Sequence, residues 1–335
     1  MEATAAHPSG KDAGLCPGGN RLARRPALAF GVLIAVNAMW AFQFSGARLA
    51  VSELGPVLVT LVPLAIATLL VIPFAKLNLD LFRPGHRKLI CDVFLLGTFG
   101  VLPAQLCLVF GVQKTLASNA SVLSLTIPVL TAICASLLLD ERMTALRWIS
   151  FTVAILGVCL VSVRDIQHSR LFTLEYLTGN LLVLASCAGS AFNNSYSRRV
   201  LAQLSPAQLL VWSFLVTDLE LIAIFALSGA GGWRRLAHLE PSVWWSLTLI
   251  AVFSLGFSML LYFWVIQAVE VMQATLSVYL LPVFGVLFSS LLLSEKLTVG
   301  LIGGGILIFI SCFLVTVYEE RGRLRKEQVT IHVRD

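Results

Sequence analysis

The sequence predicts an all-α integral membrane protein with ten transmembrane helices, arranged as two inverted repeats of five helices each. Three observations predict this fold: the composition, the length of the apolar blocks and an internal repeat. Of the 335 residues, 58% are hydrophobic and only 13% are charged. A water-soluble domain typically has about 25% charged residues, so most of this chain is expected to lie in lipid.

The apolar residues fall into ten blocks of about 18–25 residues, which is the length that crosses a bilayer as an α-helix. Charged residues and clusters of proline and glycine separate these blocks. The expected helices are 27–47, 55–75, 89–111, 116–139, 146–163, 176–197, 207–228, 242–268, 271–293 and 298–318. The predicted units are a disordered cytoplasmic tail (1–25), a first repeat (26–164), a linker (165–175), a second repeat (176–318) and a basic cytoplasmic tail (319–335).

The distribution of the basic residues that give the net charge of +6 is typical of a membrane protein rather than of a nucleic-acid-binding protein. With the N-terminus inside and ten crossings, 17 of the 24 Lys and Arg residues fall in cytoplasmic segments and seven fall outside. That bias is the one that orients helices during insertion. The sequence therefore predicts both termini in the cytoplasm and no nucleic-acid partner. The compact loops and the lack of an organelle-targeting segment favour a bacterial inner membrane.

The second half of the chain repeats the first. Residues 118–163 align without a gap to residues 272–317, and 12 of these 46 positions are identical. The stretches "LLLDERMT" (137–144) and "LLLSEKLT" (291–298) share this register of 154, and "AFQFSGAR" (41–48) meets "AFNNSYSR" (191–198) in a register of 150. The chain therefore consists of two copies of a five-helix unit.

An odd number of crossings makes the second copy enter the membrane from the opposite side, so the repeats are inverted. Inverted repeats recur in secondary transporters because two such halves can expose one central site to each face in turn. The sequence therefore predicts transport.

These motifs resemble the drug/metabolite transporter superfamily, in particular its EamA-like members with ten helices. Pro128 with "LLLDERMT", Pro282 with "LLLSEKLT" and "WAFQFSGARLAVSELGP" in the first helix carry the resemblance over about 27–318. The resemblance implies a cavity lined by helices one, three, four, six, eight and nine.

The repeated hairpin itself is expected to be structural. Thr144 and Thr298 are placed to cap the start of the next helix, with the carboxylates of Glu141 and Glu295 near its positive end. Pro128 and Pro282 interrupt their helices and free carbonyl groups, either to line a cavity or only to shape the helix.

Uncharged polar residues within the spans are the candidate substrate-binding residues, because polar side chains in hydrocarbon are costly unless they face protein or water. They lie on the helices that the resemblance assigns to the cavity, and each alternatively serves only to join helices. The candidates are Asn37, Trp40, Gln43, Gln105, Asn119, Asn193, Asn194, Tyr262, Gln273 and Tyr279. Such a lining suits a small polar or amphipathic solute such as an amino acid.

Asp218 is the candidate for proton coupling because it is an acid inside a predicted span; Glu220, two residues on, points to a different face. Gly300 and Gly304 form a GxxxG pattern, which fits close packing within the chain or between the protomers of a homodimer.

The predicted transporter is expected to work as an exporter. Two other classes of protein are alternatives to a transporter. An embedded enzyme would need a catalytic constellation, but all five histidines lie in loops or tails and no HExxH, GxSxG or phosphate loop is present. The seven cysteines form no CxxC pair, so no metal or other cofactor is expected. A passive pore or lipid scramblase is hardly distinguished from a carrier by sequence.

Overall fold

The computed structural model describes residues 26–75, 87–138, 145–161, 174–228, 233–236, 238–265, 277–311 and 313. Within these ranges the secondary structure is helical, with no strand. Five described helices are long and apolar enough to cross a membrane: Gly31–Leu54, Pro56–Phe74, Arg87–Lys114, Pro206–Leu227 and Pro241–Tyr262. Shorter apolar helices lie beside them at Ala117–Thr131, Trp148–Val161, Val278–Leu293 and Val299–Ser311.

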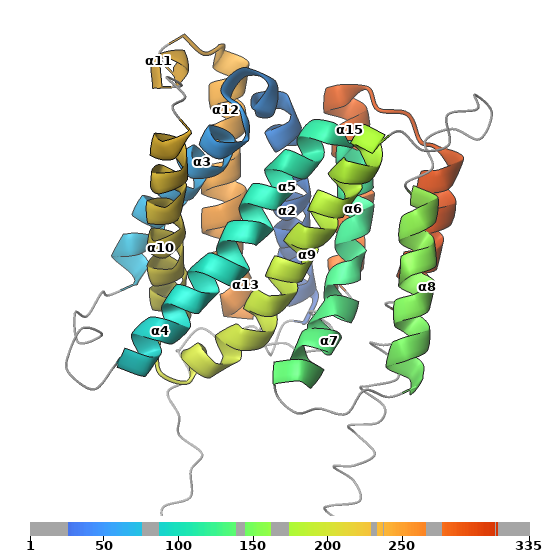
Figure 1. The fold of residues 1–335 in the computed structure, drawn as a ribbon, viewed down its shortest axis with the longest axis horizontal. Coiled ribbons are helices and arrows are strands. Elements are labelled where there is room, and N and C mark those ends of the chain that lie inside the picture. The colour runs from blue at the N-terminus through green and yellow to red at the C-terminus, as the bar shows by residue number, and fades with distance from the viewer. Residues whose placement is uncertain are drawn as a thin grey trace, which may run out of the picture.

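The first repeat runs through five helical units (Figure 1). They are α2 (Pro26–Leu54); α3 (Pro56–Val71) with the 3-10 turn η1 (Ile72–Phe74); α4 (Arg87–Leu95), η3 (Leu96–Val101) and α5 (Leu102–Lys114); α6 (Ala117–Leu123), η4 (Ser124–Thr126) and α7 (Ile127–Leu138); and α8 (Ala145–Val161).

The second repeat follows the same order. Its units are α9 (Leu174–Leu201); α10 (Pro206–Leu227); α12 (Pro241–Leu249), η5 (Ile250–Phe257) and α13 (Ser258–Val265); η6 (Val278–Leu280) and α15 (Leu281–Leu293); and the helix Val299–Ser311. The short α11 (Trp233–Leu236) lies between α10 and α12.

The first helix is longer than hydropathy predicts: α2 continues to Leu54, whereas the predicted helix ends at residue 47. Its last residues are a mixture of polar and apolar side chains that helices tolerate once they leave the hydrocarbon core. The helix ends where Gly55 adopts a left-handed backbone conformation, with φ of 76°, and Pro56 begins α3. A residue without a Cβ adopts this conformation without steric cost, and proline is suited to the first position of a helix.

The helix breaks occur at equivalent positions of the two repeats. The π-helical segments η3 and η5 begin at Leu96 and Ile250, and the 3-10 turns η4 and η6 begin at Ser124 and Val278. Both pairs are separated by 154 residues, which is the register of the sequence repeat. Each 3-10 turn leads directly into a helix with proline at its second position, Pro128 in α7 and Pro282 in α15. Proline lacks an amide hydrogen and its ring collides with the carbonyl four residues earlier, so regular α-helical bonding cannot pass this point.

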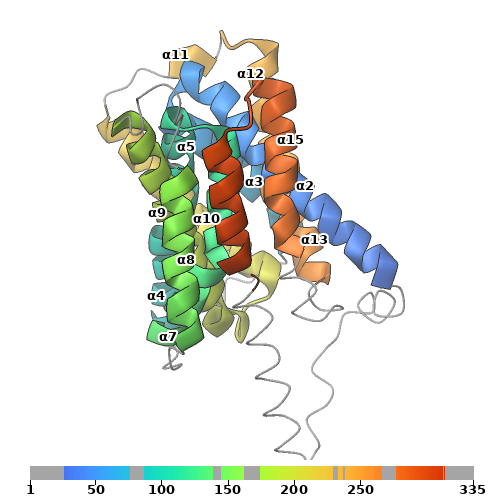
Figure 2. The same ribbon diagram turned by 90° about the vertical axis from the view of Figure 1, so that its right-hand side faces the viewer.

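Contacts between the repeats are also paired. The helices α8 and Val299–Ser311 cross side by side at one edge of the bundle (Figure 2), and a Cβ at Gly304 would lie only 2.4 Å from the carbonyl oxygen of Gly157. Ser311 donates a hydrogen bond to the carbonyl oxygen of Ser150 at the same crossing. Gly304 is the repeat equivalent of Ser150, and Ser311 is the equivalent of Gly157. The second glycine of the GxxxG pattern is therefore used for packing within the chain.

The two ends of the bundle are distinguished by different contacts. At the upper end in Figure 1, α2 and α5 end beside each other, where Arg48 contacts Gln113. At the lower end, the hydroxyl of Tyr196 in α9 donates to Asp92 Oδ1 in α4 over 2.7 Å.

Candidate functional site

The polar face of α2 meets three different helical units. Asn37 is fully buried, and its Nδ2 donates to the carbonyl oxygen of Leu33 at 2.8 Å and to Ser277 Oγ, just before η6, at 3.1 Å. The indole of Trp40 packs against the ring of Tyr262 in α13, with ring centroids 5.1 Å apart. One turn further on, the side-chain amide of Gln43 donates to Gln105 Oε1 in α5 at 2.5 Å.

Asn37, Trp40 and Gln43 recur every third residue, so they form one slowly turning side of the helix. The structure thus places five of the predicted binding residues along one side of α2: Asn37, Trp40, Gln43, Gln105 and Tyr262. We call these five residues and Ser277 the α2 polar cluster.

Two atoms of the α2 polar cluster are buried without a hydrogen-bond partner in the described part of the chain: Asn37 Oδ1 and Trp40 Nε1. One is an acceptor and the other a donor. A buried polar atom without a partner costs about 1–3 kcal/mol, so most proteins leave few of them. These two atoms are therefore the ones that a bound solute could satisfy.

The other predicted binding residues lie outside the α2 polar cluster. Asn193 in α9 lies against η3, where a Cβ on Gly100 would be 3.1 Å from its Cβ, and Asn194 is exposed. Asn119 in α6 is buried and donates to Thr115 Oγ1 near the upper end. The ring of Tyr279 packs on Phe309 of the last helix, with centroids 4.9 Å apart. Gln273 lies outside the described residues.

Asp218 in α10 is 7% exposed and faces α3. Its Oδ2 accepts a hydrogen bond of 2.7 Å from the hydroxyl of Thr68, while its Oδ1 is buried without a partner in the described part of the chain. Thr68 and Asp218 are 150 residues apart, so they are equivalent residues of the two repeats that touch each other. Two equivalent residues can meet only near the axis that relates the repeats.

Glu220 turns to a different neighbour, as the spacing of two residues from Asp218 requires. Its Oε1 accepts a hydrogen bond from the hydroxyl of Thr98 in η3, and its Oε2 is buried without a partner among the described residues. Neither Thr68 nor Thr98 was predicted from the sequence. The repeat register was the available signal for Thr68, because it aligns this threonine with Asp218.

The hairpin after α15 joins the two repeats. Ser294 has a left-handed backbone with φ of 54°, and the carboxylate of Glu295 then accepts hydrogen bonds from the amides of Ala117 and Ser118, both at 3.0 Å, and from Ser118 Oγ at 2.7 Å. Glu295 thus caps α6 of the first repeat instead of the helix that follows it, because the free amides at the start of α6 lie within its reach.

Thr298 Oγ1 accepts a hydrogen bond from the amide of Leu301 at 3.1 Å, which is an N-cap of the last helix. Glu141 and Thr144 of the equivalent hairpin lie outside the described residues.

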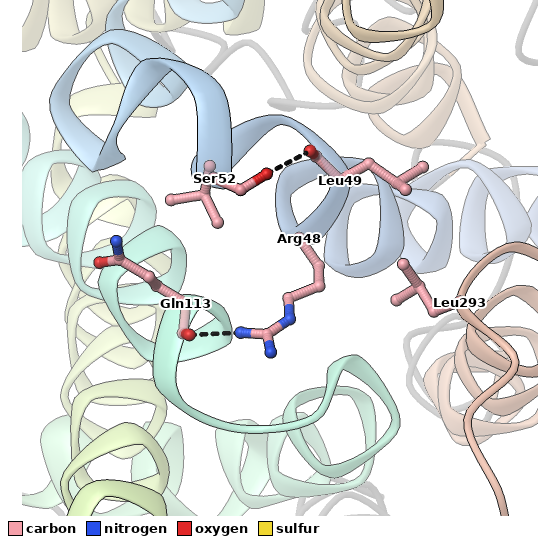
Figure 3. A pocket seen from close by; sticks show the side chains of 6 residues that line it. Arg48, Leu49, Ser52, Gln113 and Leu293 are labelled. Atoms are coloured by element: carbon pink, nitrogen blue, oxygen red, sulfur yellow. Dashed lines mark hydrogen bonds between the residues drawn. The ribbon is translucent and has the colours of Figure 1, made fainter.

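The described part of the bundle contains hollows at other places. A cavity of about 400 Å³ lies at the upper end and is lined by Arg48, Leu49, Val51, Ser52, Gln113 and Leu293 (Figure 3). A second, of about 210 Å³, is lined only by apolar residues of α2, α12, η5 and α15, namely Ala38, Met39, Phe42, Leu249, Phe253 and Phe288. No role of Arg48 was predicted from the sequence.

Comparison with known proteins identifies the family. The model of the EamA-like transporter family matches residues 27–163 and again residues 177–317. The chain belongs to this family. Its relatives include the uncharacterized transporter YoaV of Bacillus subtilis, 23% identical over 85% of this chain and 95% of the relative. An uncharacterized transporter of Archaeoglobus fulgidus is 24% identical over 85% of this chain and 97% of the relative.

A solved crystal structure has the same fold, with a TM-score of 0.57 and 19% identity over 88% of this chain and 98% of its own. The family match and the helical architecture together confirm the expected resemblance and the fold class, an all-α membrane protein of ten helices in two inverted repeats. They also confirm a general role in transport.

Proposed function

We propose that this EamA-like protein is a secondary transporter that exports small polar or amphipathic metabolites such as amino acids across a bacterial inner membrane. In this proposal both chain ends lie in the cytoplasm, and the two repeats rock to expose one site to each face in turn. The observation that carries the proposal is the α2 polar cluster, with its unpartnered Asn37 Oδ1 and Trp40 Nε1.

The chemistry of the α2 polar cluster supports the solute class. Its side chains are amides, hydroxyls and aromatic rings, none of which carries a charge at neutral pH. A solute that donates to Asn37 Oδ1 and accepts from Trp40 Nε1 would remove two unsatisfied polar atoms from the interior. The Trp40 and Tyr262 rings would cover its apolar part.

The position of the α2 polar cluster supports alternating access. Its residues come from helices of both repeats, since α2 and α5 belong to the first and α13 and Ser277 to the second. Relative motion of the repeats would therefore change the site's shape and the face to which it opens. A solute that binds one arrangement better shifts the equilibrium between the two.

Asp218 is the proposed coupling residue. Burial of a carboxyl group disfavours its charged form, and Asp218 lies where equivalent helices of the two repeats touch. Binding or release of a proton would change the charge at this contact. A proton gradient could then bias the relative position of the repeats.

The test has two stages. Metabolite profiles of the medium are first compared between overexpressing and null cells, and the solute that accumulates outside is chosen. Its uptake is then measured in proteoliposomes containing the purified protein, with and without unlabelled solute inside. For a carrier, the rate of uptake saturates with solute concentration and rises when unlabelled solute is present inside. A rate that increases linearly with concentration and does not depend on the solute inside would instead identify a pore or scramblase.

The variant Trp40→Phe keeps the aromatic ring and removes the indole donor. One neutral hydrogen bond contributes about 0.5–1.5 kcal/mol, so KM for the solute should rise by a factor between about 2 and about 13. Trp148→Phe is the matched control, because Trp148 is 56% exposed on α8. Equal KM values for the two variants would remove Trp40 Nε1 from the site.

A further inference from the structure

The cavity at the upper end is a candidate for a second binding site (Figure 3). It measures about 400 Å³, which falls in the range of small-molecule pockets. Its walls come from the end of α2, the end of α5 and the end of α15. Both repeats therefore contribute to it.

Two backbone carbonyl groups hold Arg48 at this cavity. Its Nη1 donates to the carbonyl oxygens of Val112 and Gln113, which are among the last residues of α5. Carbonyl groups at the end of a helix lack helical partners and carry partial negative charge, so a cation is favoured there. Both contacts use Nη1, so the donors on Nη2 and Nε are not used by any described residue.

The charge of Arg48 is not neutralised by a carboxylate within the described ranges. The acid on the neighbouring hairpin, Glu295, directs both of its oxygens to α6, where they accept from Ala117 and Ser118. The cavity thus combines a cation anchored to the end of α5 with unused N–H groups and an apolar wall formed by Leu49, Val51 and Leu293.

This combination selects one class of ligand. A guanidinium matches the two oxygens of a carboxylate with two parallel hydrogen bonds. The apolar wall favours an aliphatic group on the same molecule. Gln113 and Ser52, both exposed at the rim, leave room for a small polar substituent.

We propose that the Arg48 cavity is a vestibular binding site for small aliphatic monocarboxylates, a class that includes aliphatic amino acids. Arg48 lies five residues beyond Gln43 on α2, which corresponds to a rise of about 7.5 Å. Both residues contact α5, so the Arg48 cavity lies nearer the upper end of the bundle than Gln43 does. The repeat-equivalent position is Arg198, toward the lower end of α9, which gives an arginine position near each face.

The proposal deepens the proposed function by naming a solute class, and its test needs no transport. The reporter is Ser52→Cys in the full chain, purified in detergent so that both faces are accessible. The rate of modification by N-ethylmaleimide, a neutral reagent, is measured against increasing sodium isovalerate or isovaleramide at constant ionic strength. These two probes have the same aliphatic group and differ in the carboxylate. Modification of the native cysteines is measured in the unsubstituted chain and subtracted. Ser242→Cys, at an exposed position outside the cavity, is the control for effects of the probes on the reagent itself.

We expect isovalerate to slow modification of Ser52→Cys and isovaleramide to leave it unchanged. Arg48→Gln should raise the half-protecting concentration of isovalerate at least about tenfold, because hydrogen bonds to a charged group are lost. Since Arg48→Gln also removes a helix cap, a second variant is needed. Gln113→Glu keeps the backbone carbonyl that Arg48 contacts and places a carboxylate beside the guanidinium, so it should raise the half-protecting concentration of isovalerate to a similar extent.

Several results would overturn the proposal. Equal protection by isovaleramide would indicate an apolar hollow without carboxylate recognition. Equal protection by sodium phosphate would indicate a surface that attracts any anion, including lipid phosphate. Absence of protection by isovalerate, or full protection in Gln113→Glu, would also contradict it. Transport that persists despite such a result would leave the proposed function standing without this site.

Discussion

Removal of the Glu295 carboxylate should destabilise the contact between the two repeats at the upper end. In the native chain this side chain satisfies two free amides at the start of α6 and one hydroxyl. The negative charge also lies at the positive end of α6. Glu295→Ala leaves both amides without their partner.

The size of the effect follows from these contacts. Loss of a helix N-cap costs about 0.5–2 kcal/mol, and hydrogen bonds to a charged group contribute about 1.5–3 kcal/mol. Glu295 is only half-buried, so water can replace part of what is lost. We expect Glu295→Ala to lower the free energy of unfolding by about 2 kcal/mol. Glu295→Gln, which keeps one acceptor oxygen, should cost about half as much.

The assay is thermal unfolding of the purified protein in detergent, followed by loss of the monodisperse fraction. For a chain of this size about 2 kcal/mol corresponds to a decrease in Tm of about 3 °C. Lys296→Ala is the matched control, because Lys296 is the exposed neighbour of Glu295. If Glu295→Ala and Lys296→Ala unfold at the same temperature, the hairpin does not fasten the two repeats.

Two further variants test other contacts. Asp218→Asn should abolish the response of proteoliposome uptake to an imposed proton gradient while uptake without a gradient persists; an unaltered response would exclude Asp218 from coupling. Gly285→Ala should lower the stability by about 1–3 kcal/mol, because its Cβ would lie 2.2 Å from the Cβ of Ser121 where α15 crosses α6. Gly303→Ala has no atom within 4 Å of the new Cβ and should unfold no earlier than the native chain, so equal loss of stability in both would contradict the close crossing.

The fold was predictable because its two signals act over long stretches of sequence. Twenty apolar residues in a row indicate a membrane helix whatever surrounds them, and a shared register of 154 indicates repeats without knowledge of any contact. The end of α2 was not predictable from hydropathy, because a helix continues past the hydrocarbon core until a residue such as Gly55 stops it.

The site was predictable only in part. The spacing of Asn37, Trp40 and Gln43 on one helix indicated a shared face, and the structure places those side chains against three neighbouring units. The spacing within a helix does not reveal which neighbour a face meets, so Asn119 and Tyr279 were grouped with them although they pack elsewhere. Glu295 was assigned to its own next helix for the same reason: its partner is 177 residues away in the other repeat.

The inversion of the two repeats underlies the whole account, and one pair of substitutions tests it directly. Ser52 lies in the last turn of α2, and Ala202 directly follows the end of α9. The two positions are 150 residues apart, are equivalent in the two repeats and are both exposed. Each is replaced by cysteine and treated with a membrane-impermeant maleimide, first in intact cells and then after permeabilisation, with the unsubstituted chain as background. The account predicts labelling of Ser52→Cys in intact cells and of Ala202→Cys only after permeabilisation. Labelling of both from the same face would contradict it.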